Sequence, residues 1–237
     1  MLLSLMYHNI NSDKYTNNLE IFEKHLKYIK ENFNIVLPGD SLGKKNICLV
    51  FDDGYYNFYN YVFPLLKELN IKMMFAIPTA FILDVTKVEK KKRLNIKHDE
   101  AEQNVEYAPY CTYEELKEMS DSGLVKIASH SVNHVDLTKA NNLILELNDS
   151  KKNLEKKINI KCDSLVLPFG KYDEKVISEA KKIYKYIFRI GNGINKDFLG
   201  IKGLIYRVSA DNLKNEKDIF SWQNMLKYRL KSFLKSF

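Results

Sequence analysis

Short apolar runs alternate with longer amphipathic stretches along this chain. The runs predict buried strands over residues 2–7, 47–51, 73–77, 125–128, 164–167, 186–190 and 204–208. Apolar residues recur at helical spacing between them, which predicts helices over 19–31, 57–69, 140–158 and 172–184. A capping-box pattern at Thr112 opens one more helix, which ends near Gly123. This alternation predicts an α/β fold in which a mainly parallel sheet of about seven strands closes into a distorted (β/α) barrel.

One domain over residues 1–237 accounts for the chain, because 237 residues with 45% hydrophobic content suit a single sizeable core. Two segments stand outside the strand–helix alternation. Residues 81–111 carry a basic run and then an acidic patch, and we interpret them as an inserted loop that forms either a short lid or a solvated connection. Residues 216–237 predict a C-terminal amphipathic helix.

The C-terminal helix allows two interpretations. Its apolar residues fall on one side, and Lys227, Lys231 and Lys235 form a basic row at a spacing of four. That pattern is typical of a helix lying on an anionic membrane surface, which would give peripheral membrane contact. It also suits an outer helix of the barrel with a stripe of exposed lysines.

The chain carries 37 basic and 30 acidic residues, a formal charge of +7. This excess favours anionic partners, but the lysines are spread widely and no nucleic-acid-binding module is recognisable, so we expect no nucleic acid partner. Three cysteines without a CxxC spacing fit a reducing compartment. Because no signal-like start and no long apolar run is present, we expect a cytoplasmic protein, at most peripheral to a membrane, unless a signal was removed. The oligomeric state stays open.

Polar residues follow the predicted strands where each strand ends. They are His8 after the first strand, Asp52 and Asp53 after the second, His130 after the fourth, and Arg207 at the end of a late one. The carboxyl ends of the strands of an α/β barrel share one face, where active sites lie. We therefore expect these side chains to converge.

Two adjacent carboxylates end the second strand in the sequence FDDG. Neighbouring side chains on a strand point in opposite directions, but a bend at Gly54 would turn both towards one pocket. Two ionised carboxylates repel unless a cation offsets them, so a metal could bind one and leave the other free as a base. A plain Asp-Asp-Gly turn is the alternative.

The sequence SHSVNH, residues 129–134, places His130 and His134 four residues apart. On a helical turn this spacing puts both imidazoles on one face, a common geometry for two ligands of one metal. A surface pair of histidines is the alternative. Together with Asp53 they would form an Asp-His-His set that leaves room for water, as catalytic zinc and related divalent ions require.

Three segments, in this order, resemble motifs of the polysaccharide deacetylase family, also called NodB-homology or carbohydrate esterase family four. Residues 51–77 (FDDGYYNFYNYVFPLLKELNIKMMFAI) resemble its first motif with the following helix and strand. Residues 129–137 (SHSVNHVDL) resemble its histidine motif, and residues 167–176 (LPFGKYDEKV) its Pro-aromatic-Gly motif. The resemblance covers about residues 47–190, and it implies a distorted barrel that hydrolyses N-acetyl, sometimes O-acetyl, groups on sugars.

The family resemblance also implies roles for the motif residues. The resemblance implies that Asp53, His130 and His134 are the ligands of one divalent ion. Zinc is the expected metal, and nickel, cobalt and iron stay open. Asp52 is then the general base. A backbone N–H at Phe169, after Pro168, would help hold the oxyanion. Tyr55 would line the sugar site or, alternatively, pack the next helix.

The chain departs from the family pattern in two places. Val166 stands where many members carry an arginine, and no histidine follows His134, where many members carry the general acid. In the branch that acts on poly-N-acetylglucosamine, an N-terminal histidine replaces the late one, and MYHNI at 6–10 resembles that element, so His8 is the expected acid. Arg207, in LIYRVS, resembles a late arginine of this branch that orients the base, although a buried salt-bridge arginine is equally consistent.

The sequence therefore predicts a metal-dependent hydrolase that removes N-acetyl groups from a saccharide and releases acetate. One alternative is an O-acetyl esterase or a non-sugar amide hydrolase on the same barrel. Another is a catalytically silent module that binds glycans or lies at a membrane. A polymer, a lipid-linked sugar and a nucleotide-linked sugar all stay open as substrates.

Overall fold

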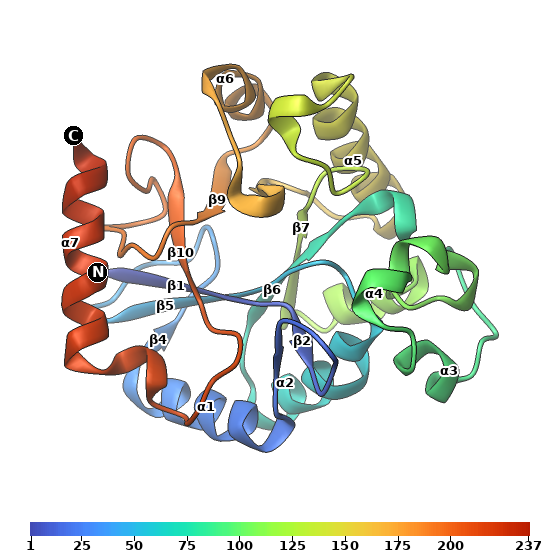
Figure 1. Cartoon of the computed structure of the whole chain (residues 1–237), viewed down its shortest axis with the longest axis horizontal. Coiled ribbons are helices and arrows are strands. Elements are labelled where there is room, and N and C mark those ends of the chain that lie inside the picture. Colours follow the sequence, from blue (N-terminus) through green and yellow to red (C-terminus); the bar gives the residue numbers. More distant parts are fainter.

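Seven parallel strands form a closed barrel in the computed structural model, which describes residues 1–237 (Figure 1). In chain order the strands are β1 (Leu2–Tyr7), β5 (Asn46–Phe51), β6 (Met73–Ile77), β7 (Val125–Ser129), β8 (Ser164–Val166), β9 (Tyr186–Ile190) and β10 (Ile205–Ser209). The ring closes because β1 pairs with β5 along one edge and with β10 along the other. The predicted barrel is confirmed.

Three shorter strands were not predicted, because two residues leave no periodicity to detect. They are β2 (Asn9–Ile10), β3 (Thr16–Asn17) and β4 (Asn34–Ile35). β4 pairs with the start of β5, whereas β6 pairs with its end. β2 and β3 form a small separate sheet directly after β1, where the chain leaves the barrel.

Seven α-helices surround the strands (Figure 1). They are α1 (Leu19–Asn32), α2 (Phe63–Leu69), α3 (Lys90–Leu94), α4 (Tyr113–Asp121), α5 (Leu143–Ile158), α6 (Glu174–Ile183) and α7 (Trp222–Ser236). A π-helical turn at Phe58–Val62 leads into α2. The 3₁₀ turns are Thr79–Phe81, His98–Gln103, Val105–Tyr107, Leu137–Lys139, Pro168–Gly170 and Asp218–Phe220. The capping box predicted at Thr112 is present, with Glu115 as its second member.

Two apolar clusters fix the barrel. Thirteen buried residues, among them Val50, Met74 and Phe188, fill its interior, and 48 buried residues join the strands to the surrounding helices. Because side chains alternate along a strand, each of the seven barrel strands contributes to both clusters. The interior of the barrel is therefore packed, and a cavity lies at the end of the barrel where polar residues follow the strands.

The segment 81–111 is folded against the barrel through a buried arginine. Arg93, 5% exposed, donates two hydrogen bonds to Glu115 (2.6 and 2.8 Å) and others to the carbonyls of Ala108 (2.8 Å) and Tyr110 (2.9 Å). A bidentate pair of this kind fixes orientation as well as position. The segment thus has a fixed position next to the carboxyl ends of the strands.

Candidate active site

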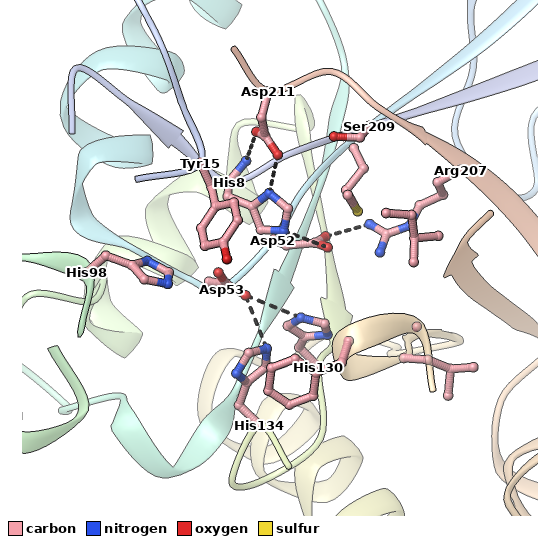
Figure 2. Close-up of a pocket in the computed structure, with 15 residues that line it drawn as sticks. His8, Tyr15, Asp52, Asp53, His98, His130, His134, Arg207, Ser209 and Asp211 are labelled. Carbon is pink, nitrogen blue, oxygen red and sulfur yellow. Dashed lines mark hydrogen bonds and ion pairs between the residues drawn. The ribbon is translucent and has the colours of Figure 1, made fainter. Parts of the chain in front are cut away.

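A cavity of about 320 Å³ lies at the carboxyl ends of the strands (Figure 2). The predicted groups that line it are His8, Asp52, Asp53, His130, His134, Phe169 and Arg207. They come from segments up to two hundred residues apart, because parallel strands all end at the same rim. The volume is at the lower end of the range for ligand sites.

The turn after β5 aims both carboxylates into the cavity. Asp53 has a φ of 71° and Gly54 a φ of 74°, a left-handed conformation that an aspartate seldom adopts. A side chain at Gly54 would also meet the Pro78 Cδ atom at 3.3 Å. Such strain persists only where the surroundings enforce it, and it is typical of functional sites. The predicted bend is thus present, and it begins one residue earlier than expected.

The histidines lie on a loop after β7, so the helical turn assumed for them is wrong. Ser131 and His134 have φ values of 66° and 50°, which lie outside the right-handed helical region. Glu146, buried on α5, accepts hydrogen bonds from the backbone N–H groups of Val132 and Asn133, both at 2.9 Å. This carboxylate shapes the loop so that both rings still turn to one side, as Figure 2 shows.

Asp53, His130 and His134 form one cluster, here called the ligand cluster. Their potential ligand atoms all lie within 4.8 Å of one another. The Nε2 atoms of His130 and His134 lie 3.4 and 3.3 Å from the same Asp53 oxygen. Ligands about 2.0–2.1 Å from a tetrahedral ion are about 3.4 Å apart, so these separations fit one divalent cation. His130 Nδ1 pairs with the Val166 carbonyl at 2.8 Å, which leaves Nε2 as the ligand atom.

The protonation states in the ligand cluster suit a metal. Burial lowers the pKa of His134 to about 4, so its imidazole is neutral at neutral pH, the form that binds metals. Burial acts to raise the pKa of Asp53, but the hydrogen bond with His130 and the charges of His134 and His8 outweigh it and hold that pKa below its ordinary value. An ionised carboxylate beside the neutral imidazole of His134 suits a divalent ion.

A second set of residues lies opposite the ligand cluster in the cavity. It consists of His8, Asp52, Arg207 and Asp211 and is here called the proton-transfer group. Arg207, 1% exposed, donates a hydrogen bond from Nη1 to Asp52 Oδ1 at 2.7 Å. The other Asp52 oxygen lies 3.9 Å from His8 Nε2. His8 Nδ1 pairs with Asp211 at 2.7 Å, and its backbone N–H donates to the same carboxylate at 3.0 Å. Asp52 is therefore held outside the ligand cluster, with an imidazole facing it.

His8 has the opposite charge state to His134. Burial acts to lower the pKa of His8, but the hydrogen bond with Asp211 and the charges of Asp53 and Asp52 outweigh it and raise the pKa to about 9. The imidazole is therefore protonated at neutral pH, the form that can donate a proton. Asp211 holds the Nδ1 side of the ring, so the Nε2 proton faces the cavity.

The other predicted site residues, Phe169, Pro168 and Tyr55, lie at the edge of the cavity or outside it. The Phe169 ring lies 4.8 Å from the His134 ring, and Phe169 has a φ of 55° at the cavity rim. Pro168 is buried behind it and is not among the residues that line the cavity. Tyr55 does not line the cavity either, because its ring stacks on Tyr110 at 5.0 Å. It supports the wall of the cavity from behind.

Four residues at or next to the cavity were missed: Tyr15, His98, Glu146 and Asp211. Tyr15 and His98 line the rim, with their rings 5.2 Å apart, and His98 Nδ1 is buried without a partner. Asp211 lies two residues after β10, so the rule that located His8 after β1 would have found it. No sequence signal marked Glu146, which lies inside an ordinary amphipathic helix.

The closed parallel barrel and its Asp-His-His cluster place the molecule in the class of NodB-type (β/α) barrels. A family model described as polysaccharide deacetylase matches residues 39–186. The chain belongs to the polysaccharide deacetylase family, and the resemblance noted in its motifs is confirmed.

Two relatives and one solved structure are similar to the chain. The polysaccharide deacetylase-like protein YxkH of Bacillus subtilis is 27% identical over 75% of this chain and 60% of its own length. The poly-beta-1,6-N-acetyl-D-glucosamine N-deacetylase of Escherichia coli is 32% identical over 40% of this chain and 13% of its own. The chain thus spans less than two thirds of either relative. The deacetylase PplD of Streptococcus pyogenes, solved with acetate, shares the fold, with a TM-score of 0.74 and 23% identity over 96% of this chain and 97% of its own.

Proposed function

We propose that the protein is a metal-dependent deacetylase that hydrolyses the N-acetyl group of a saccharide and releases acetate. The observation that carries the proposal is the division of the cavity into two parts. The ligand cluster can hold a cation, whereas Asp52 stays outside it and faces a protonated His8. Family membership supports the reaction class, and the name of the Escherichia coli relative supports an N-acetylated sugar as substrate.

Asp53, His130 and His134 would hold the metal. A divalent cation bound there supplies Lewis-acid chemistry: it lowers the pKa of water and polarises a carbonyl oxygen. Zinc suits this mixed carboxylate and imidazole set, and nickel, cobalt and iron are compatible with it.

The proton-transfer group would perform the acid–base steps. As the oxygen of water bonds to the acetyl carbon, one of its protons passes to Asp52, whose position Arg207 fixes. As the carbon–nitrogen bond breaks, His8 gives its Nε2 proton to the departing sugar nitrogen. Acetate and a free amino sugar result, and the proton taken by Asp52 is available to recharge His8. The Phe169 backbone N–H at the rim would face the oxyanion.

An acetate-release assay on N-acetyl and O-acetyl sugars, paired with a measurement of bound metal, tests the proposal. We expect about one divalent ion per chain and acetate from N-acetyl substrates. An amide needs a proton on its leaving nitrogen, whereas an ester leaving group depends less on it. Acetate from O-acetyl sugars alone would make the protein an esterase, and the absence of both metal and acetate would make it a silent binding module.

A further inference from the structure

The outward face of α7 is apolar apart from Gln223, although a helix on the outside of a barrel normally exposes polar residues. Its exposed apolar side chains are Trp222 (73%), Leu226 (49%), Leu230 (56%), Phe233 (62%) and Leu234 (71%). At 3.6 residues per turn these positions cover an arc of roughly 120°. We call this arc the α7 stripe. Contiguous apolar surface of this kind marks an interaction site.

The opposite face of α7 holds the helix on the barrel. Tyr228 is buried there, and Ser232 accepts a hydrogen bond from the Ile194 backbone N–H at 2.6 Å. Figure 1 shows α7 as the outermost element on its side of the molecule, next to the start of β1. The stripe therefore faces away from the protein, and none of its residues lines the catalytic cavity.

Cations flank the α7 stripe and no acid lies on the helix. Arg229 borders one side of the arc, and Lys227 and Lys231 border the other, as the helical spacing requires. Residues 222–236 contain neither Asp nor Glu. An apolar stripe between cationic margins is the pattern of helices that lie in the surface of an anionic bilayer.

The stripe continues into a hollow at the start of α7. Trp222 and Leu226 form one wall of a depression of about 640 Å³, whose other lining includes Phe33 and Phe220. The charged residues of the lining are Lys45 and Arg229. The apolar residues of this depression suit the part of a lipid acyl chain next to the headgroup, and its two cations suit an anionic headgroup.

We propose that α7 docks the protein on an anionic lipid surface, with the stripe in the interface and its cations against the headgroups. A second copy of the chain fits this face less well. A two-fold contact sets a patch against the same patch of the other copy, so the cations Lys227, Arg229 and Lys231 of both copies would be brought together with no acid on α7 to offset them. Docking through α7 leaves the cavity open, because the stripe and the cavity share no residue.

Trp222 gives a direct readout, because it is the only tryptophan of the chain. Vesicles of phosphatidylglycerol and phosphatidylcholine should shift its emission to the blue and protect it from acrylamide, whereas pure phosphatidylcholine should act weakly. The fraction of protein that floats with vesicles should likewise be higher for the anionic vesicles than for pure phosphatidylcholine, and it should decrease as the salt concentration rises. Absence of any shift and of flotation with anionic vesicles would overturn the proposal.

Variants separate the apolar and the charged contributions. The double variant Leu230→Glu/Phe233→Glu should abolish flotation, whereas Ile144→Glu/Leu145→Glu, which changes an exposed apolar pair on α5, should not. Lys227→Gln/Arg229→Gln should weaken anionic binding by about fivefold for each cation removed. Equal losses in both double glutamate variants would contradict a role for α7.

Self-association is the other outcome of the test. Light scattering without vesicles should give the mass of one chain, 27.8 kDa. A dimer that shields Trp222 without lipid and dissociates in Leu230→Glu/Phe233→Glu would replace the lipid surface by a second copy. Because no substrate is used, these results are independent of the proposed deacetylase activity.

Discussion

Two histidines in the same cavity are held in opposite charge states. His134, in the ligand cluster, has a pKa lowered to about 4 by burial, whereas His8, in the proton-transfer group, has a pKa raised to about 9, chiefly by Asp211. Both are mostly buried, so burial alone does not explain the difference. Burial dominates at His134, where the opposing effect of Asp53 is reduced by the neighbouring histidines His130 and His8. At His8 the hydrogen bond with Asp211 and the charges of Asp53 and Asp52 outweigh burial and stabilise the charged imidazole. One cavity can thus provide a neutral ligand and a proton donor at the same pH.

Removal of a ligand should have the largest effect. Asp53→Ala and His130→Ala should lose bound metal together with activity, because the cation contributes several kcal/mol of transition-state stabilisation, at least about 10³-fold in rate. Metal analysis beside acetate release measures both. Glu100→Ala, exposed on the 3₁₀ turn His98–Gln103, is the control and should keep the metal. Activity without metal in either variant would remove the basis for the ligand cluster.

Loss of the proton donor should come next. His8→Ala should lower kcat for an N-acetyl substrate by about 10²–10⁴-fold, the usual contribution of a positioned acid, while metal content stays unchanged. The same variant should lose less activity on an O-acetyl substrate. If His8→Ala lost the metal instead, the two parts of the cavity would not be separate.

Asp211→Asn should have a smaller, pH-dependent effect. His8 must be protonated to act, so activity should persist below its pKa and fall as the pH rises through about 9. Without the Asp211 charge the pKa falls towards the ordinary value of about 6.5, so the loss should begin at lower pH. At pH 8 we expect roughly a tenfold reduction, and near pH 6 little change. Asp121→Asn, on the surface of α4, is the control, and identical pH profiles would contradict the assignment.

The smallest effect on activity should come from a substitution of His98, at the rim of the cavity. His98 lines the cavity, its Nδ1 is buried without a partner, and its backbone N–H donates to Asp13 at 3.1 Å. A single hydrogen bond to a sugar hydroxyl contributes about 1 kcal/mol, so His98→Ala should raise KM about fivefold with kcat nearly unchanged. A reduction in kcat alone would place His98 among the reacting groups.

Much of the barrel could be predicted because its strands are mainly apolar runs, and most cavity residues could be predicted because they follow strands. The geometry of His130 and His134 could not be predicted from the sequence, because it depends on Glu146. This residue contacts their loop from more than a dozen positions further along the chain. Asp211 lies 203 residues from His8, its partner, so no local pattern joins them. Roles that depend on such pairings follow from the closed ring and not from periodicity.

The pairing of β1 with both β5 and β10 has a consequence for synthesis on the ribosome. Residues 39–186, the part that the family model matches, contain the whole ligand cluster but neither His8 nor Asp211. A nascent chain can therefore bring its metal-binding side chains together early. His8, the proposed proton donor, gains its partner Asp211 only when β10 has emerged and paired with β1. The proposed hydrolysis therefore requires the closed ring, in which His8 and Asp211 are partners.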